Sequence, residues 1–168
     1  MADKRTGWFM IGDPKQAIYA FRGADVFTYL KARRATEGNH YTLDKNFRSA
    51  EAMVAAVNHL FTYSQEAFGD VFMMDNAIPF ETVKAQGRKE ELLVDGAPKA
   101  GITLWVDDRE KPVSAGPYRE EQAARCANHI AHLLNGAEQG VTGFRDDDGF
   151  TPLHPNDIAI LVRDRIEA

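Results

Sequence analysis

The chain has 168 residues, of which 44% are hydrophobic and 27% charged, and its formal net charge is −5 at neutral pH. This length suffices for one domain, or for one domain with part of another, and the composition argues against global disorder. The negative charge argues against a free-standing duplex-binding protein, because phosphate neutralisation needs clustered Lys and Arg. No stretch approaches the apolar length of a membrane span or signal peptide, and there is one cysteine, so we expect a cytoplasmic protein.

The first predicted element is a buried strand over residues 8–11, which stops at a sharp turn, Gly12-Asp13-Pro14. A short helical turn over residues 16–21 is expected to follow. Asp25 is a suitable N-cap for a helix that ends in basic residues near Gly38. The residues expected on the inner side of this helix are Phe27, Tyr29 and Leu30.

Residues 41–43 predict a second strand, and Ser49 is expected to cap a helix that runs to about Phe61. The apolar face of this helix comprises Met53, Val54, Val57, Leu60 and Phe61. From residue 64 to residue 100 the periodicity fades among glycines, prolines and mixed charge, which indicates a long irregular excursion containing a hairpin. We expect no functional site in this excursion.

Regular patterns return in the last third of the chain. Residues 102–106 alternate as in a strand, and residues 118–135 form a helix that we expect to stop at Gly136, with an outer Glu121–Arg125 pair. The inner residues of that helix are Ala123, Cys126, Ala127, Ile130, Leu133 and Leu134. Residues 158–162 are continuously apolar, as in a strand that is covered on both faces of a parallel sheet. Alternating strands and helices favour a layered α/β sheet.

The first group of candidate functional residues lies within residues 12–25, directly after the first predicted strand. Gln16 carries an amide that can orient a water molecule or sense a phosphate. Tyr19 and Phe21 offer ring faces on which bases stack, and Arg22 offers a cation for phosphate. The alternative is a capped turn whose rings pack in a core.

The second group lies within residues 41–49, where Phe47 and Arg48 stand between a predicted strand and a predicted helix. A guanidinium matches the charge that spreads over a phosphoryl group during its transfer. The alternative is a structural ion pair between Arg48 and Asp44.

Both segments resemble motifs of one protein family. Residues 11–25 resemble motif III, and residues 41–49 resemble motif IV, of the RecB-type DNA helicases of superfamily 1, the UvrD/Rep-like family that includes the beta subunit of exodeoxyribonuclease V. The two motifs occur in the family's order and with its short spacing. Residues 157–163 also resemble the family's strand before an inserted accessory subdomain. The resemblance is strong from about residue 9 to residue 61 and looser beyond.

The resemblance implies an incomplete α/β fold of the RecA-like, P-loop NTPase type, with three layers and a mainly parallel sheet. Residues 1–38 would be the tail of the first RecA-like domain, and residues 39–168 the N-terminal part of the second. Gln16 and Arg48 would be catalytic, and Phe47 would stack on the nucleotide base beside them. Tyr19, Phe21 and Arg22 would contact single-stranded DNA. No metal ligand is implied.

The parent implied by this family is an ATP-dependent DNA helicase and exonuclease that acts on duplex ends in recombinational double-strand break repair. It would use ATP and Mg²⁺, and its partners would be DNA, the remaining RecB chain and RecC- and RecD-type subunits. The 168 residues lack the GxxxxGK[ST] loop, the acidic magnesium-binding segment, motifs V and VI and the nuclease domain. We therefore expect an inactive fragment without a tightly bound cofactor. The alternatives are a non-catalytic module with a helicase-like fold that binds DNA or a partner, and a nucleotide-binding fold unrelated to DNA.

Three other patterns have structural interpretations. Cys126, His129 and His132 share one predicted helix, but the first and last of them point away from each other, which argues against a zinc site. Residues 146–149 lack the alternating ligands of a calcium loop, so they predict a solvated turn. His154 is expected on a loop surface.

Overall fold

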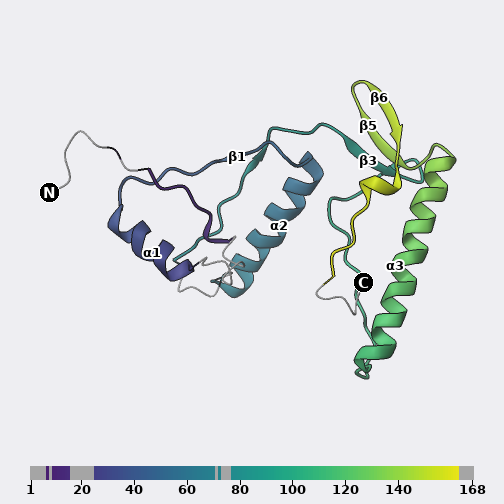
Figure 1. Ribbon diagram of the computed structural model, residues 1–168, viewed down its shortest axis with the longest axis horizontal. Helices are drawn as coiled ribbons and strands as arrows, with labels where there is room; N and C mark the ends of the chain where they lie inside the picture. The colour runs from purple at the N-terminus through teal and green to yellow at the C-terminus, as the bar shows by residue number, and fades with distance from the viewer. Residues whose placement is uncertain (1–6, 8, 16–24, 71, 73–76, 163–168) are drawn as a thin grey trace. The chain divides into compact units, whose positions relative to one another are not determined.

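The computed structural model describes residues 7, 9–15, 25–70, 72 and 77–162 (Figure 1). Contacts divide the chain into two compact units, and one of the three points where the chain passes between them falls within α2. The first unit comprises Met1–Asp44 with Phe61–Thr82, and the second comprises Lys45–Leu60 with Val83–Ala168. The elements in chain order are α1 (Val26–Ala35), β1 (Lys45–Asn46), α2 (Glu51–Phe68), β2 (Lys84–Ala85), β3 (Glu91–Val94), β4 (Ala97–Pro98), α3 (Ala115–Glu138), β5 (Gly143–Asp146), β6 (Gly149–Pro152) and the short 3-10 helix η2 (Pro155–Asp157).

Local signals at both ends define α1 in the first unit. The Asp25 carboxylate accepts a hydrogen bond from the backbone N–H of Phe27 at 2.9 Å, which confirms the predicted N-cap. Arg33 and Arg34 occupy the last turn, where cations face the negative end of the helix dipole. Phe27 is exposed, however, so its predicted inward placement is wrong.

In the first unit, an aromatic cluster packs the segment after α2 against the C-terminal half of that helix. Phe61 stacks against Phe72 and Phe80, with ring centroids 5.7 and 5.0 Å apart. The side chain of Gln65 accepts a hydrogen bond from the backbone N–H of Phe80 at 3.2 Å, and Ile78 is buried. These contacts explain why α2 continues to Phe68, past the predicted end near Phe61.

The second unit contains an antiparallel sheet with the strand order β4-β3-β5-β6. Asp95 and Gly96 join β3 to β4 with φ values of 54° and 76°, and two such residues in sequence are typical of a type I′ hairpin turn. The expected hairpin in the irregular region is therefore confirmed. The second hairpin, β5–β6, was not predicted, although its turn at residues 146–149 was expected as a solvated turn.

The long helix α3 lies beside this sheet, and the hairpin β5–β6 is at its C-terminal end (Figure 1). Gly136 does not stop the helix as predicted, because it serves in close packing instead. A Cβ at position 136 would overlap the hydroxyl of Thr142, a residue that is fully buried. The carbonyl of Gly136 also accepts hydrogen bonds from the backbone N–H groups of Val141 and Thr142, at 2.9 and 3.0 Å. The chain turns after the helix at Gly140, whose φ is 73°.

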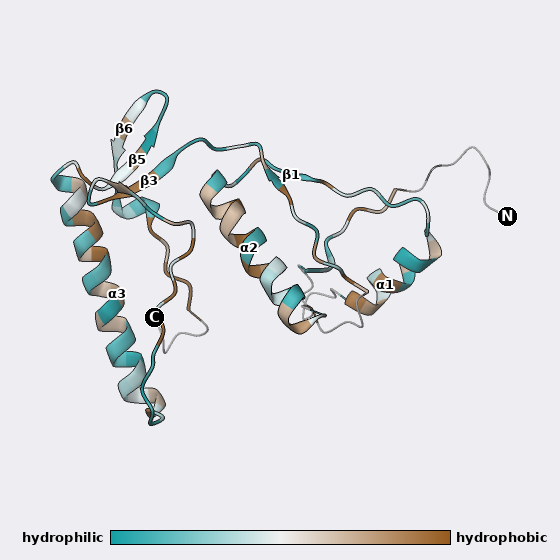
Figure 2. Cartoon of the chain, turned by 180° about the vertical axis from the view of Figure 1, so that it is seen from behind, coloured by the Kyte–Doolittle hydropathy of each residue, from teal (hydrophilic) through white to brown (hydrophobic). Residues whose placement is uncertain are grey.

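Four predicted strands are not strands in the structure. The described residues of 8–11, and residues 41–43, 102–106 and 158–162, have no regular secondary structure, and several apolar side chains there are strongly exposed, such as Phe9 (90%) and Leu161 (97%). A buried strand needs neighbours that satisfy its backbone and cover its faces. No strand in the described part of the chain pairs with any of these four segments. Figure 2 accordingly shows hydrophobic, brown stretches on irregular segments.

The architecture is mixed α/β with a small parallel sheet and a larger antiparallel one. Among the described strands only β1 and β2 pair in parallel, so the prediction of a mainly parallel sheet is wrong for these residues. Each helix in the described ranges is too short or too polar to cross a membrane.

Candidate functional site

Four of the six predicted site residues lie outside the described residues. Gln16, Tyr19, Phe21 and Arg22 fall within residues 16–24, for which no structure is described. The described site is therefore the segment Phe47–Arg48, which we call the Phe47 loop.

The Phe47 loop stands at the carboxyl end of a parallel strand pair. Strand β1 ends at Asn46, and its register partner in β2 is Ala85. In layered α/β folds the carboxyl ends of parallel strands are where ligands bind. The loop ends before α2, which begins at Glu51 rather than directly after Ser49 as predicted.

Hydrogen bonds accepted by Asn46 fix the conformation of the Phe47 loop. Its side-chain oxygen accepts from the backbone N–H groups of Arg48 and Ser49, both at 2.9 Å. Its backbone carbonyl accepts from the N–H of Gln86, also at 2.9 Å. One asparagine thus ties the loop to itself and to the segment after β2.

Two further contacts hold the segment around β2 in place. The side-chain amide of Asn58, on α2, makes two hydrogen bonds with the backbone of Val83. Its Nδ2 donates to the carbonyl at 2.8 Å, and its Oδ1 accepts from the N–H at 3.2 Å. Gly87 approaches the Phe47 loop so closely that a Cβ would overlap the carbonyl oxygen of Phe47. Only glycine allows this approach without movement of the backbone.

Both side chains of the Phe47 loop are available to a ligand. Phe47 is 68% exposed, and Arg48 is exposed as well. Within the described part of the chain, neither Arg48 nor Asp44 takes part in an ion pair, so the alternative of an Arg48–Asp44 pair is not formed. An unpaired guanidinium beside an exposed aromatic ring suits a ligand that has both a base and phosphates.

An open depression of about 350 Å³ adjoins the loop, lined by Phe47, Gly87, Arg88, Lys89, Glu90 and Asp146–Asp148. Lys89 and Asp147 form an ion pair of 2.7 Å across it. The hydrogen bond from Lys89 lowers the pKa of Asp147. The acidic turn between β5 and β6 therefore neutralises one of the cations beside the loop.

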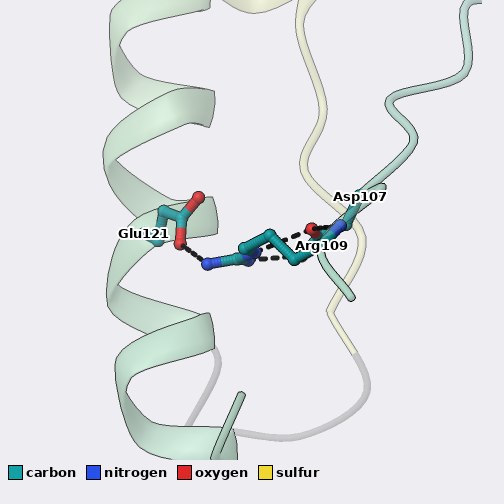
Figure 3. Close-up of polar contacts among 3 residues, drawn as sticks. All are labelled: Asp107, Arg109 and Glu121. Carbon is teal, nitrogen blue, oxygen red and sulfur yellow. Dashed lines mark hydrogen bonds and ion pairs between the residues drawn. The ribbon is translucent and has the colours of Figure 1, made fainter. Parts of the chain in front are cut away.

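A second polar cluster, centred on Arg109, was not predicted (Figure 3). The Arg109 guanidinium donates hydrogen bonds to both carboxylate oxygens of Asp107 and to the carboxylate of Glu121, the latter at 2.8 Å. The side-chain hydrogen bond from Arg109 lowers the pKa of Asp107 to about 2. Glu121 was instead expected to pair with Arg125. The alternation Asp-x-Arg at residues 107–109 is the one sequence signal that indicates this contact.

Three other polar residues on α3, Arg125, His129 and His132, have structural partners. Arg125 lies 5.6 Å from the ring centroid of Trp105, and His129 meets the same ring edge-on at 5.3 Å. His132 contacts the Asp95 carboxylate at 3.0 Å. In the described ranges no group of His, Cys, Asp and Glu is arranged to hold a metal ion. The exposed His154 caps η2.

Comparison with known proteins gives consistent relatives. Residues 1–37 match the UvrD/REP helicase N-terminal domain. The chain is 41% identical over 165 residues to the RecBCD enzyme subunit RecB of Escherichia coli, and the match covers 97% of the chain and 13% of that protein. It is 39% identical over 169 residues to RecB of Mycolicibacterium smegmatis, covering 98% of the chain and 14% of that protein. It is also 36% identical over 166 residues to RecB of Haemophilus influenzae, covering 99% of the chain and 13% of that relative.

Proposed function

Because the chain belongs to the RecB family of helicases, we propose that it supplies half of a nucleotide site and part of a DNA surface to a larger helicase-nuclease subunit. The chain spans 13% of the length of RecB from Escherichia coli. The parent would couple ATP hydrolysis to unwinding and degradation of duplex DNA ends during recombinational repair. The relatives are named as the RecB subunit of a RecBCD enzyme. These names support the rest of the RecB chain and RecC- and RecD-type subunits as partners of this chain in the parent.

The observation that carries this proposal is the exposed, unpaired Arg48 beside the exposed Phe47 at the end of β1. In the parent, Phe47 stacks on the base of ATP and Arg48 reaches its γ-phosphate. A guanidinium there stabilises the charge of the transferring phosphoryl group. In other nucleotide hydrolases such an arginine raises kcat by roughly 10³–10⁵-fold. Gln16 senses the γ-phosphate, while Tyr19, Phe21 and Arg22 contact single-stranded DNA.

We also propose the domain division and the fold of the parent. Residues 1–38 end its first RecA-like domain, and residues 39–168 begin the second. The match to the UvrD/REP helicase N-terminal domain ends at residue 37, which supports this boundary. The exposed apolar segments of the chain support a RecA-like sheet whose remaining strands come from the rest of the parent.

The Mg²⁺ that accompanies ATP in such enzymes does not fit the residues that the structure describes. The described ranges offer no suitable group of ligands, and the sequence has no GxxxxGK[ST] loop. Residues of the parent outside this chain would therefore hold the metal and cradle the phosphates, while this chain would supply the base contact and the arginine that reaches the γ-phosphate.

The test is steady-state ATP hydrolysis by the full-length parent with DNA present. Arg48→Lys should lower kcat by roughly 10³-fold with a small change in KM, because a lysine lacks the planar fork of donors. Phe47→Ala should mainly raise KM for ATP, and Phe47→Tyr should restore it.

Arg34→Lys, at the exposed end of α1, is the matched control and should leave both constants unchanged. An Arg48→Lys enzyme that turns over ATP at the original rate would refute the proposed role of Arg48. The isolated 168-residue chain should show no ATP turnover.

A further inference from the structure

The segments that border the Phe47 loop concentrate positive charge in an otherwise acidic chain. Residues 45–48 and 84–89 contain five basic residues and no carboxylate, whereas the whole chain has a net charge of −5. The five are Lys45, Arg48, Lys84, Arg88 and Lys89. The parallel pairing of β1 with β2 brings these two distant segments together.

The pairing of the two strands places like charges side by side. Lys45 and Lys84 are direct register partners, so their side chains leave the same face of the ladder, with the strands about 4.8 Å apart. Like charges in this position destabilise a sheet. Both lysines are exposed, and in the described part of the chain neither has a carboxylate partner. A bound polyanion would relieve this repulsion.

Arg88 extends the charge past the end of β2. It lines the open depression with Phe47, and it too has no ion-pair partner among the described residues. The neighbouring Lys89 differs, because Asp147 already neutralises it at 2.7 Å. Glu90 and the acidic turn at Asp146–Asp148 border the same depression and would repel an anion there.

We propose that Lys45, Lys84 and Arg88 form a cationic patch that binds the phosphodiester backbone of single-stranded DNA, as a second contact surface apart from residues 19–22. From Lys84 to Arg88 the chain spans at most about 13 Å. This reach lets the patch contact more than one phosphate of the same strand. Clustered cations without carboxylate partners are typical of surfaces that bind the backbone of a single strand without sequence preference.

The patch rests on the proposed action of the parent on DNA, but the two ideas fail differently. If the unsubstituted parent does not bind single-stranded DNA at all, the proposed function is wrong. If it binds DNA but the patch residues do not contribute, only the patch is wrong.

The experiment measures binding of a fluorescently labelled oligothymidylate to the full-length parent, without ATP, over a range of salt concentrations. Log K falls as log salt rises, and each cation lost from a single-strand contact makes this negative slope shallower by about 0.7. In the triple variant Lys45→Gln, Lys84→Gln and Arg88→Gln, the magnitude of the slope should therefore be smaller by about 2. Lys45→Arg with Lys84→Arg should keep the original slope, because the charge remains.

Two controls make the outcome specific to the patch. Lys99→Gln removes an exposed charge elsewhere in the same unit and should not change the slope. Asp147→Asn removes the ion-pair partner of Lys89 and should make the slope steeper, because a further cation becomes available to DNA. Equal slopes for the triple variant and the unsubstituted parent would overturn the proposal. So would a triple variant that loses affinity for a fluorescent ATP analogue but not for the oligothymidylate, because the patch would then serve the triphosphate.

Discussion

Gly87 shows how one residue without a side chain positions the candidate nucleotide contact. A methyl group at this position would overlap the carbonyl of Phe47, so Gly87→Ala should force the Phe47 loop away from β2. Overpacking of this kind destabilises a protein by about 1–3 kcal/mol. The free energy of unfolding from urea titration measures the effect.

Gly116 offers a matched control in α3. A Cβ at this position meets open space, and alanine is favoured over glycine within a helix by roughly 0.5–1 kcal/mol. Gly116→Ala should therefore leave the chain as stable or slightly more stable. If both substitutions changed stability by the same amount and sign, the close approach of Gly87 to the Phe47 loop would not matter.

The Arg109 cluster gives a prediction about pH. The hydrogen bond from Arg109 lowers the pKa of Asp107 from 3.8 to about 2. Because the folded pKa is the lower one, the pair stabilises the fold fully above about pH 4, and this contribution is lost as the pH falls through about 2. A carbon NMR titration of the Asp107 carboxyl group should give a midpoint near 2.

Two variants separate the causes of this shift. Arg109→Gln should return the Asp107 midpoint to near 3.8, its ordinary value, because the largest cause is the Arg109 hydrogen bond. Glu121→Gln removes the other carboxylate bound to Arg109 and should leave the Asp107 midpoint low. A midpoint that stays near 2 in Arg109→Gln would contradict the assigned cause.

At the scale of elements, helices were more predictable than strands because their signals are local. The Asp25 cap and the basic last turn define α1 without help from the rest of the molecule. The ends of helices were less predictable where packing decides them. From the sequence, Gly136 predicts the end of a helix. In the structure it lies inside α3, because the close approach of Thr142 leaves no room for a side chain at this position. The aromatic contacts of Phe61 likewise carry α2 past its predicted end.

Strands depend on partners that a local pattern does not contain. The apolar run at residues 158–162 indicates a doubly covered strand, but the described part of the chain leaves it uncovered. The hairpin β5–β6 forms from residues with little apolar alternation. An ion pair between Arg145 of β5 and Glu91 of the neighbouring strand β3 helps to hold it in the sheet.

The candidate site shows the same division between local and distant information. The sequence places Phe47 and Arg48 in a loop before a helix, and the structure confirms that loop. The sequence gives no sign that β2 and Gly87 lie beside it, because they are separated from it by the whole of α2. The proposed roles of Gln16, Tyr19, Phe21 and Arg22 stay predictions.

At the scale of the whole chain, exposed apolar side chains are the feature with the largest physical consequence. Leu104 and Val106 on one segment, and Ile160 and Leu161 on another, are all more than half exposed. Large apolar side chains that are exposed together on one segment are typical of a surface that a partner covers. In the parent, the covering surface would come from the rest of the RecB-type chain, of which this chain represents 13% in the Escherichia coli relative.

The isolated 168-residue chain should therefore self-associate, with a sedimentation coefficient that rises with protein concentration. Full burial of one leucine contributes about 1.5–3 kcal/mol, so Leu104→Lys should weaken the association measurably. Thr103→Lys adds the same charge at an exposed polar position and should change it much less. If both lysines weakened association equally, charge repulsion would explain the result and the apolar segment would not be the contact surface. A chain that stays monomeric at all concentrations would show that these side chains are covered within the chain itself.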